Sequence, residues 1–442
     1  MGPLASSGEV ESKTFFVGQN DPIHFNSKKP PRTYKSYESG LASVLPDYWD
    51  SPGNESAIQS LDKSASELRA RYGWGTEVKY SGRIKALDGL LGLQISGSNE
   101  EAKLGSGYNA TVYLANDKST GNKYAVKIIS SDSGDRFLQP DNGEYLGLSL
   151  LPHKGIASIC ALIVHNTVDK TYAAIKGPQS ILSENCQDYR IRCVISEYIE
   201  GEDLFDTLNG YWSILEKTDL AIQVALQGSA ALGHYHQHDI LYRDMKPENI
   251  MISPGREGSQ VDVKLVDAGT IIRLSDAKNV DATIVGTKEY MAPEVIDVYC
   301  NQKMDSICDV GVDLWGLGVT LIAVVTDHDL FQLVKQYYKD IKKPIDESLR
   351  KEWDKKAEWN KEFAKMNDKT KREILNKNLG LLLNNPSFVR KYNPLVNVII
   401  GLTKSSPEDR MALADVQKTL APILTPASLQ EDIRNQSQVI YV

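Results

Sequence analysis

Two different spacings of apolar residues divide the chain. From Glu101 to about residue 199, short apolar runs alternate with glycine-rich or polar turns, such as residues 116–122, which predicts a meander of antiparallel strands. From Tyr211 onward the apolar residues recur at helical spacing, interrupted by a strand hairpin around 250–266. The pattern therefore predicts an α+β protein in which a smaller, mostly β part precedes a larger helical part.

The first 96 residues form an N-terminal extension with a weaker pattern. Residues 1 to about 45 are rich in Ser, Gly, Pro, Lys and Asn, so no fold is predicted there. The spacing over 56–71 predicts a short helix, and the apolar stretch 84–95 is expected to pack on the following domain. Structural bracing is one role for this extension, and regulation or partner binding is the alternative. Residues 426–442 form a C-terminal tail.

A second unusual segment lies between Leu330 and Asn378. It carries 14 Lys or Arg and 9 Asp or Glu at largely helical spacing. Such a run usually forms a solvent-exposed helix face, with a partner or regulatory role as the alternative.

Length and composition narrow the class of protein. A chain of 442 residues predicts two or three packed units. The net charge of −8 argues against nucleic acid as the main partner. The five cysteines include no CxxC pair, which favours reduced, mostly buried thiols. The apolar stretch 319–325 is far shorter than the ~20 residues of a membrane span, and no leader opens the chain, so a cytoplasmic protein is expected.

Three motifs carry the chemistry. Residues 242–249 read Tyr-Arg-Asp-Met-Lys-Pro-Glu-Asn and are followed by Asp-Ala-Gly at 267–269 and Ala-Pro-Glu at 292–294. Phosphoryl transfer needs a carboxylate to orient the attacking hydroxyl, an amide and a second carboxylate for magnesium, and a cation on the moving phosphate. In these motifs the chain resembles the eukaryotic-type Ser/Thr protein kinase family over about residues 97–425.

The resemblance implies a bilobal protein kinase fold, with an N-lobe over 97–199 and a C-lobe over 200–425. It implies that Asp244 orients the substrate hydroxyl and that Lys246 neutralises the transferred phosphoryl group. Asn249 and Asp267 would hold Mg²⁺, or Mn²⁺ in its place.

The nucleotide side of the resemblance begins at residues 104–112, Leu-Gly-Ser-Gly-Tyr-Asn-Ala-Thr-Val, which resemble the glycine-rich loop except that Ala110 replaces the third glycine. Taken alone, this loop is equally typical of a β-turn. It is followed by Ala125-Val126-Lys127, which resembles the strand-lysine motif of the family and strengthens the resemblance. Glu144 is the expected carboxylate partner of Lys127, an exposed surface glutamate being the alternative. The resemblance places these residues at ATP: Leu104, Gly105, Ser106, Gly107, Val112, Ala125, Lys127, Glu197, Ile199, Asp203 and Met251. Asp203 would face the ribose or a basic substrate residue, or is a plain surface acid.

Residues 283–294 resemble the end of an activation segment. Thr287 stands where the family has a Thr that hydrogen-bonds the catalytic Asp and Lys, which favours Ser or Thr over Tyr as the acceptor. Thr283 stands at the usual phosphorylation position, where Arg243 could pair with its phosphate, or is a plain exposed threonine. The resemblance also implies that Asp313 braces the catalytic loop and that Arg410 forms an ion pair with Glu294.

Two departures from the family affect packing and leave the chemical groups in place. Tyr242 replaces the usual His and Ala268 replaces the usual Phe, so the larger ring is expected to fill the volume that the smaller residue vacates. With Ala110, these departures keep an ATP-binding pseudokinase or scaffold as the alternative function. A small-molecule phosphotransferase of related fold is a more distant alternative, which the peptide-docking motifs disfavour.

The sequence therefore predicts an enzyme that transfers the γ-phosphate of MgATP to Ser or Thr residues of a protein substrate. The divergent motifs and the extension also resemble the kinases that bacterial pathogens deliver into host cells. In that case the host cytosol would be its location.

Overall fold

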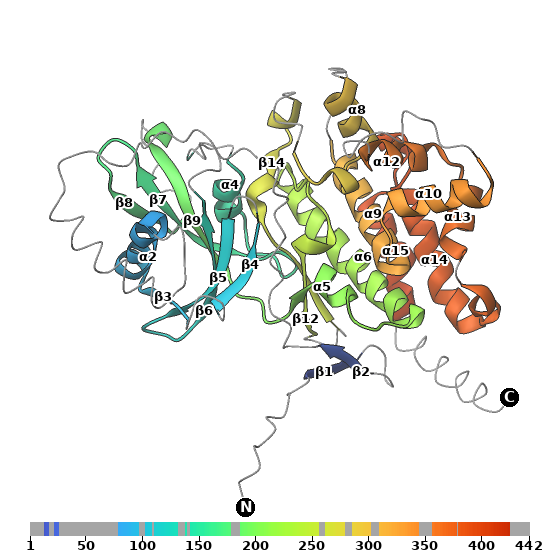
Figure 1. The fold of residues 1–442 in the computed structure, drawn as a ribbon, viewed down its shortest axis with the longest axis horizontal. Coiled ribbons are helices and arrows are strands. Elements are labelled where there is room, and N and C mark those ends of the chain that lie inside the picture. Colours follow the sequence, from blue (N-terminus) through green and yellow to red (C-terminus); the bar gives the residue numbers. More distant parts are fainter. Residues whose placement is uncertain are drawn as a thin grey trace, which may run out of the picture. The chain divides into compact units, whose positions relative to one another are not determined.

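The computed structural model describes residues 13–16, 22–25, 78–96, 102–107, 110–130, 138, 142–177, 186–255, 261–278, 285–301, 309–343, 356–377 and 379–424. These residues divide into two compact units (Figure 1). The β-rich unit lies within 29–150 and 158–199; the helical unit lies within 1–28, 151–157 and 200–442. The predicted α+β class is confirmed. The helix expected over 56–71 lies outside the described residues.

The β-rich unit is built on one antiparallel sheet. Its strands are β3 (Leu93–Ile95), β4 (Lys103–Ser106), β5 (Ala110–Asp117), β6 (Lys123–Ile129), β7 (Ile159–Asn166), β8 (Tyr172–Ile175) and β9 (Tyr189–Glu197). They pair in the order β3-β5-β6-β9-β7-β8, with β4 also paired to β5. The β5–β6 hairpin turns at Gly121, whose φ of 74° favours glycine. The expected meander over β4, β5 and β6 is present.

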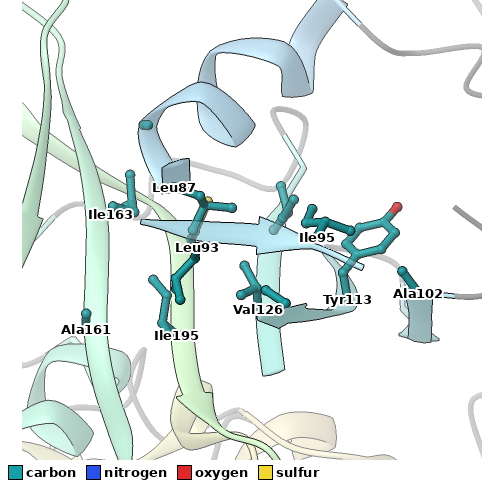
Figure 2. Packing of buried hydrophobic residues seen from close by; sticks show 13 residues of the cluster. Leu87, Leu93, Ile95, Ala102, Tyr113, Val126, Ala161, Ile163 and Ile195 are labelled. Carbon is teal, nitrogen blue, oxygen red and sulfur yellow. The ribbon is translucent and has the colours of Figure 1, made fainter. Parts of the chain in front are cut away.

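One face of this sheet is covered by helix α2 (Val78–Leu91). Figure 2 shows Leu87 of α2 and Leu93 of β3 packed over Val126 and Ile195 of the sheet. The apolar stretch 84–95 therefore packs as expected. It also contributes a strand, because β3 pairs with β5. The boundary drawn at residue 97 thus falls between two strands of one sheet.

A second apolar cluster lies against the short helix α4 (Gly143–Ser149). Asn142 caps this helix by accepting a hydrogen bond from the Tyr145 N–H at 3.2 Å. Tyr145 and Leu148 pack with Leu162 and Ile129 of the sheet. The cysteines in this unit differ in burial, since Cys193 is buried as predicted whereas Cys160, near the start of β7, is exposed.

The helical unit has one long helix and one almost entirely buried helix at its centre. Its helices are α5 (Leu204–Leu208), α6 (Ile214–Gln237), α8 (Pro293–Asn301), α9 (Gly311–Thr326), α10 (Leu330–Asp340), α12 (Lys356–Lys365), α13 (Asp368–Asn376), α14 (Pro386–Leu402) and α15 (Leu413–Leu420). Ser213 and Glu216 form a capping box that starts α6. Helix α9 is apolar around most of its circumference and is buried accordingly.

Short strands complete the helical unit. They are β1 (Lys13–Phe16) with β2 (Pro22–Phe25), β11 (Ile240–Leu241) with β14 (Ile272–Arg273), and β10 (Glu202–Asp203) with β12 (Ile250–Pro254) and β13 (Val261–Leu265). The expected hairpin around 250–266 is the β12–β13 pair. It holds the segment 151–157 as well, because Ala157 donates to the Leu265 carbonyl and Leu265 donates to that of Gly155, each at 2.8 Å.

The charged segment 330–378 is more than a solvent-exposed face. Trp359, Asn360 and Phe363 of α12 are 2%, 1% and 0% exposed. The expectation of a purely solvated face is therefore wrong for α12, because its apolar residues pack against Phe331 and Tyr338 of α10. Within the described ranges, no single helix has both the length and the apolar character of a membrane span, although α9 and α10, bent by 64°, meet both criteria as a pair.

Candidate active site

The loop that carries Asp244 is bound to helix α9 through Asp313. Asp313, which is fully buried, accepts hydrogen bonds from the backbone N–H groups of Tyr242 at 2.9 Å and Arg243 at 2.7 Å. The ring of His236 on α6 lies 2.8 Å from the same carboxylate. The expected bracing contact of Asp313 is present. A carboxylate that binds consecutive backbone N–H groups fixes the direction of the loop.

Asp244 is the centre of a dense hydrogen-bonded group. Its Oδ2 atom lies 2.8 Å from the Asn249 amide nitrogen and 2.9 Å from Lys246 Nζ. Its Oδ1 atom accepts a hydrogen bond of 2.8 Å from the hydroxyl of Thr287, which in turn accepts one of 2.6 Å from Lys246. The expected contacts of Thr287 with both residues are therefore present, and they join the loop 242–249 to the segment 285–294.

The residue before Thr287 must be a glycine. Gly286 has a φ of 113°, and a Cβ atom added there would lie 2.7 Å from the Arg243 carbonyl oxygen. A side chain at this position would strain the backbone and displace the catalytic loop. Gly286 thus allows the close approach through which Thr287 reaches Asp244.

The turn that contains Asp267 lies beside the ring of Tyr242. The Tyr242 hydroxyl donates to the Val266 carbonyl at 2.5 Å, and Thr270 donates to the Tyr242 carbonyl at 3.0 Å. Tyr242 is fully buried and stacks on Tyr235. Asp267 and Arg243 both have positive φ values, 61° and 70°. Such backbone strain in residues other than glycine is concentrated at functional sites.

Asn249 and Asp267 have the chemistry of magnesium ligands. Asn249 donates from its amide nitrogen to both the carbonyl and the carboxylate of Asp244, which leaves its amide oxygen as the remaining donor atom for a metal. Asp267 is exposed, and its carboxylate accepts a hydrogen bond from the Gly269 N–H at 3.0 Å. No group of three His, Cys, Asp or Glu able to hold a metal occurs among the described residues. Magnesium needs no such group, because it is commonly bound by one or two protein oxygens together with phosphates and water.

In the β-rich unit, the strand register places Lys127 on the face away from α2. Lys127 lies opposite Val112 on one side and Val194 on the other, and Ala125 lies two residues along the same face. The Nζ atom of Lys127 lies 3.9 Å from Glu144 Oε1. Glu144 is only 2% exposed, so the alternative of an exposed surface glutamate is wrong.

The glycine-rich segment leaves open space over its backbone. Among the described residues, a Cβ atom added at Gly105 would have no heavy atom within 4 Å, and one at Gly107 would meet the Ala110 carbonyl, at 3.9 Å. Packing therefore does not require these glycines, and an incoming group could approach the main chain closely. Ser106 and Leu104 belong to the same strand, β4, and Leu104 is 40% exposed. Tyr108 and Asn109 lie outside the described residues.

The other residues that the resemblance places at ATP lie in or near short stretches of strand. Glu197 ends β9, and its N–H donates to the Ser158 carbonyl at 3.0 Å, so this N–H is not available to a base. Ile199 follows, half-buried, at the end of the β-rich unit. In the helical unit, Asp203 pairs with Met251 across β10 and β12.

Asp203 also has a local structural role. It caps α5 by accepting a 2.7 Å hydrogen bond from the Asp206 N–H. Burial, helped by the charges of Asp206, Glu248 and Glu202, raises the pKa of Asp203 to about 6. This cap was not predicted, although Asp before a short apolar run is a typical start of a helix.

The segment after Thr287 is anchored at its far end by an ion pair. Arg410 binds Glu294 through two hydrogen bonds of 2.6 Å, and its guanidinium also donates to the Gly311 carbonyl. This expected pair is therefore present. Thr283, the expected phosphorylation position, lies outside the described residues.

Sequence reasoning missed three residues around this site. His236 contacts Asp313, and Asn360 donates to three backbone carbonyl groups of residues 288–291. Glu248 has a buried Oε2 atom with no hydrogen-bond partner among the described residues, and burial raises its pKa. His236 could have been suspected from the sequence, because it shortly precedes the loop 242–249. Asn360 and Glu248 can be recognised only from the three-dimensional structure.

Comparisons with known proteins agree with this geometry. A family model of the protein kinase domain matches residues 98–419. The chain is 28% identical over 225 residues to the mouse inhibitor of nuclear factor kappa-B kinase subunit epsilon, covering 50% of this chain and 28% of that protein. It is 30% identical over 229 residues to the Schizosaccharomyces pombe serine/threonine-protein kinase cds1, covering 50% of this chain and 43% of that protein.

A third relative is mouse Myosin-IIIb, 31% identical over 248 residues, which are 54% of this chain and 17% of that protein. The chain thus spans less than half the length of each of these relatives. The family match covers most of the chain, and the β-rich and helical units have the architecture that the fold requires. The chain belongs to the protein kinase family.

Proposed function

We propose that this protein transfers the γ-phosphate of MgATP to Ser or Thr residues of protein substrates. In this proposal Asp244 accepts the proton of the acceptor hydroxyl as the hydroxyl oxygen attacks phosphorus, and ADP leaves. Lys246 stabilises the negative charge on the transferred group, and Lys127 orients the phosphates from the β-rich unit. Glu144 holds Lys127 in position.

The observation that carries the proposal is the contact of Thr287 with both Asp244 and Lys246, at 2.8 Å and 2.6 Å. It fixes the carboxylate and the ammonium group relative to the segment that leads to Pro293 and Glu294. In the family resemblance a threonine at this position accompanies Ser or Thr acceptors. The name of one relative, a serine/threonine-protein kinase, agrees with this assignment.

The residues present fit a nucleotide and a divalent metal ion. Bound MgATP would supply the transferable phosphoryl group and neutralise the charge between its phosphates. Asn249 and Asp267 would hold Mg²⁺, or Mn²⁺, through their side-chain oxygen atoms. The open backbone at Gly105 and Gly107 would admit the phosphates, and Val112, Ala125 and Met251 would line the base.

The test is transfer of labelled γ-phosphate from ATP to a protein acceptor, followed by identification of the phosphorylated amino acid. The wild type should label Ser or Thr only when Mg²⁺ or Mn²⁺ is added. Lys127→Ala should lose transfer and keep its fold, and Asp267→Ala should lose metal-dependent ATP binding in a calorimetric titration. Label on Tyr alone would refute the acceptor class, and wild-type protein that binds MgATP but transfers nothing would favour the pseudokinase alternative.

A further inference from the structure

We infer that Asn360 is a positioning residue for the protein acceptor, acting through the backbone of residues 288–291. This inference rests on the proposed function, because it concerns how the same site receives its acceptor. Asn360 lies on α12, within the Lys- and Glu-rich segment 330–378, and is 1% exposed.

The geometry of this contact is unusual for a single side chain. The amide nitrogen of Asn360 donates to the carbonyl groups of Lys288 at 3.2 Å, Glu289 at 3.1 Å and Met291 at 2.9 Å. The amide has two hydrogens, so one of them is shared between two carbonyl groups. Three carbonyl groups within residues 288–291 therefore converge on one buried donor.

The local backbone explains why such a donor is needed. Residues Lys288–Tyr290 form a single 3₁₀ turn, in which the Lys288 carbonyl accepts the Met291 N–H at 3.3 Å. A turn this short satisfies few of its own carbonyl groups. Met291 is buried and residues 288–290 are half-buried, so a side-chain donor that reaches these carbonyl groups stabilises this conformation. Asn360 supplies that donor from about 70 residues farther along the chain, as a C-terminal cap does locally.

The position of this turn connects Asn360 to the acceptor. The turn starts directly after Thr287, which contacts Asp244 and Lys246, and ends before Glu294, which Arg410 binds. The segment 287–294 is thus fixed at its start, its middle and its end, and Asn360 holds the middle. Any displacement of residues 288–291 changes the surface beside the catalytic carboxylate on which a peptide would lie.

The packing of α12 makes Asn360 a rigid support. Trp359 packs edge-on against Phe331 at 5.4 Å between ring centroids, and Lys361 lies 2.7 Å from Asp297 on α8. Helix α12 is therefore held both to α10 and to α8, which begins at Pro293. A side chain locked by its surroundings positions a site more accurately than one on a mobile loop.

The experiment compares Asn360→Ala and Asn360→Ser with Asn397→Ala, which changes an exposed asparagine of the same unit. Serine keeps one donor and guards against failure of the alanine variant to fold. Hydrogen exchange, read by mass spectrometry, should become about tenfold faster in peptides that cover 285–297 and stay unchanged in α9. The KM for the protein acceptor should rise about tenfold for alanine and less for serine, while the KM for ATP stays constant.

Each outcome bears on a different statement. Unchanged hydrogen exchange at 285–297 in the Asn360 variants overturns the inference, whatever the activity. Active wild-type protein whose Asn360→Ala variant keeps its acceptor KM, or raises the KM for ATP equally, also overturns it. Wild-type protein that transfers no phosphate overturns the proposed function and the acceptor role with it, while faster exchange would still show that Asn360 holds the turn.

Discussion

The loop 242–249 of the helical unit and the Lys127–Glu144 pair of the β-rich unit surround their charged groups in different ways. Asp244 has three donors within 2.9 Å, and the loop around it is bound to the buried Asp313. Lys127 lies 3.9 Å from Glu144, beyond hydrogen-bond distance. Asp244 therefore has donors placed directly on its carboxylate, whereas Lys127 and Glu144 form an ion pair with no hydrogen bond between the two side chains.

The supporting elements explain this difference. Asp313 lies on α9, which has 16 residues and is buried along most of its length. Glu144 lies on α4, which has 7 residues, and each glycine inside such a helix costs about 1 kcal/mol relative to alanine. Gly147 is an interior glycine of α4, so this helix has little stability of its own. The position of α4, and with it the Lys127–Glu144 distance, depends on the packing of Tyr145 and Leu148 against the sheet.

The largest expected effect is that of Asp244→Asn. It keeps the shape of the side chain and removes the carboxylate that takes the acceptor proton, so the transfer rate should fall roughly 10²- to 10⁴-fold. The KM for ATP should change little. Initial rates of labelled phosphate transfer measure both. Asp239→Asn is the matched control, since Asp239 is exposed with a φ of 55°, which Asn also tolerates. An active Asp244→Asn variant would refute the assignment of the base.

The next largest effect is expected for the contact of Asp313 with the backbone of the loop 242–249. Asp313→Ala leaves two backbone N–H groups without their acceptor and removes the partner of His236. The free energy of unfolding should fall by about 3–5 kcal/mol, as for other buried charges that lose a partner. Urea titration gives the value. Asp327→Asn, at the exposed end of the same helix, breaks only the surface pair with Lys217 and should cost less than about 1 kcal/mol. If both variants lost the same free energy of unfolding, Asp313 would contribute no more to stability than a surface ion pair.

The two regions also differ in how far the sequence predicts them. Thr287 and Asp313 have the contacts that the resemblance implied, and short motifs identify them together with Asp244 and Asn249. Glu144 could be selected only by its distance from neighbouring motifs. Its burial and its loose contact with Lys127 depend on how α4 packs on the sheet, which local sequence does not determine.

Long-range contacts account for most of what the sequence did not predict. Asn360 stands in a Lys- and Glu-rich run whose composition indicates exposure, and its three acceptors lie 69–72 residues away. The segment 151–157 belongs to the helical unit because Ala157 bonds to Leu265, a partner that no periodicity reveals. The compensation of Ala268 by Tyr242 stays a prediction, although the Tyr242 hydroxyl does reach Val266 beside that turn.

Acid should weaken the β-rich unit through His165. Burial and the nearby charges of Arg192, Lys170 and Arg83 lower the pKa of His165 to about 4. The unfolded chain binds this proton near pH 6.5, so the stabilising contribution is complete above about pH 6.5 and is lost as the pH falls towards 4. The loss should reach roughly 2–3 kcal/mol of unfolding free energy.

Urea titrations at about pH 7.5 and about pH 5 measure this loss. His165→Phe keeps a ring against Tyr172 and should remove much of the difference between the two pH values. His328→Gln, an exposed histidine of the helical unit, should leave it unchanged. If the wild type and His165→Phe lose the same free energy on acidification, other groups control the acid sensitivity.

The smallest effect, and the most direct test of the comparison, is expected for Glu144→Gln. Glutamine keeps the length of the side chain and an acceptor for Lys127 but removes the negative charge. Because the pair lies 3.9 Å apart, kcat/KM should fall only about tenfold, well below the loss for Asp244→Asn. The unfolding free energy should change by less than about 1 kcal/mol, since a neutral group at this buried position needs less solvation than a carboxylate. Asp88→Asn, which breaks the exposed pair with Lys118 in the same unit, should leave kcat/KM unchanged. A loss for Glu144→Gln as large as that for Asp244→Asn would mean that Lys127 and Glu144 close into a tight pair during turnover, and that the looseness of the pair belongs to the resting enzyme alone.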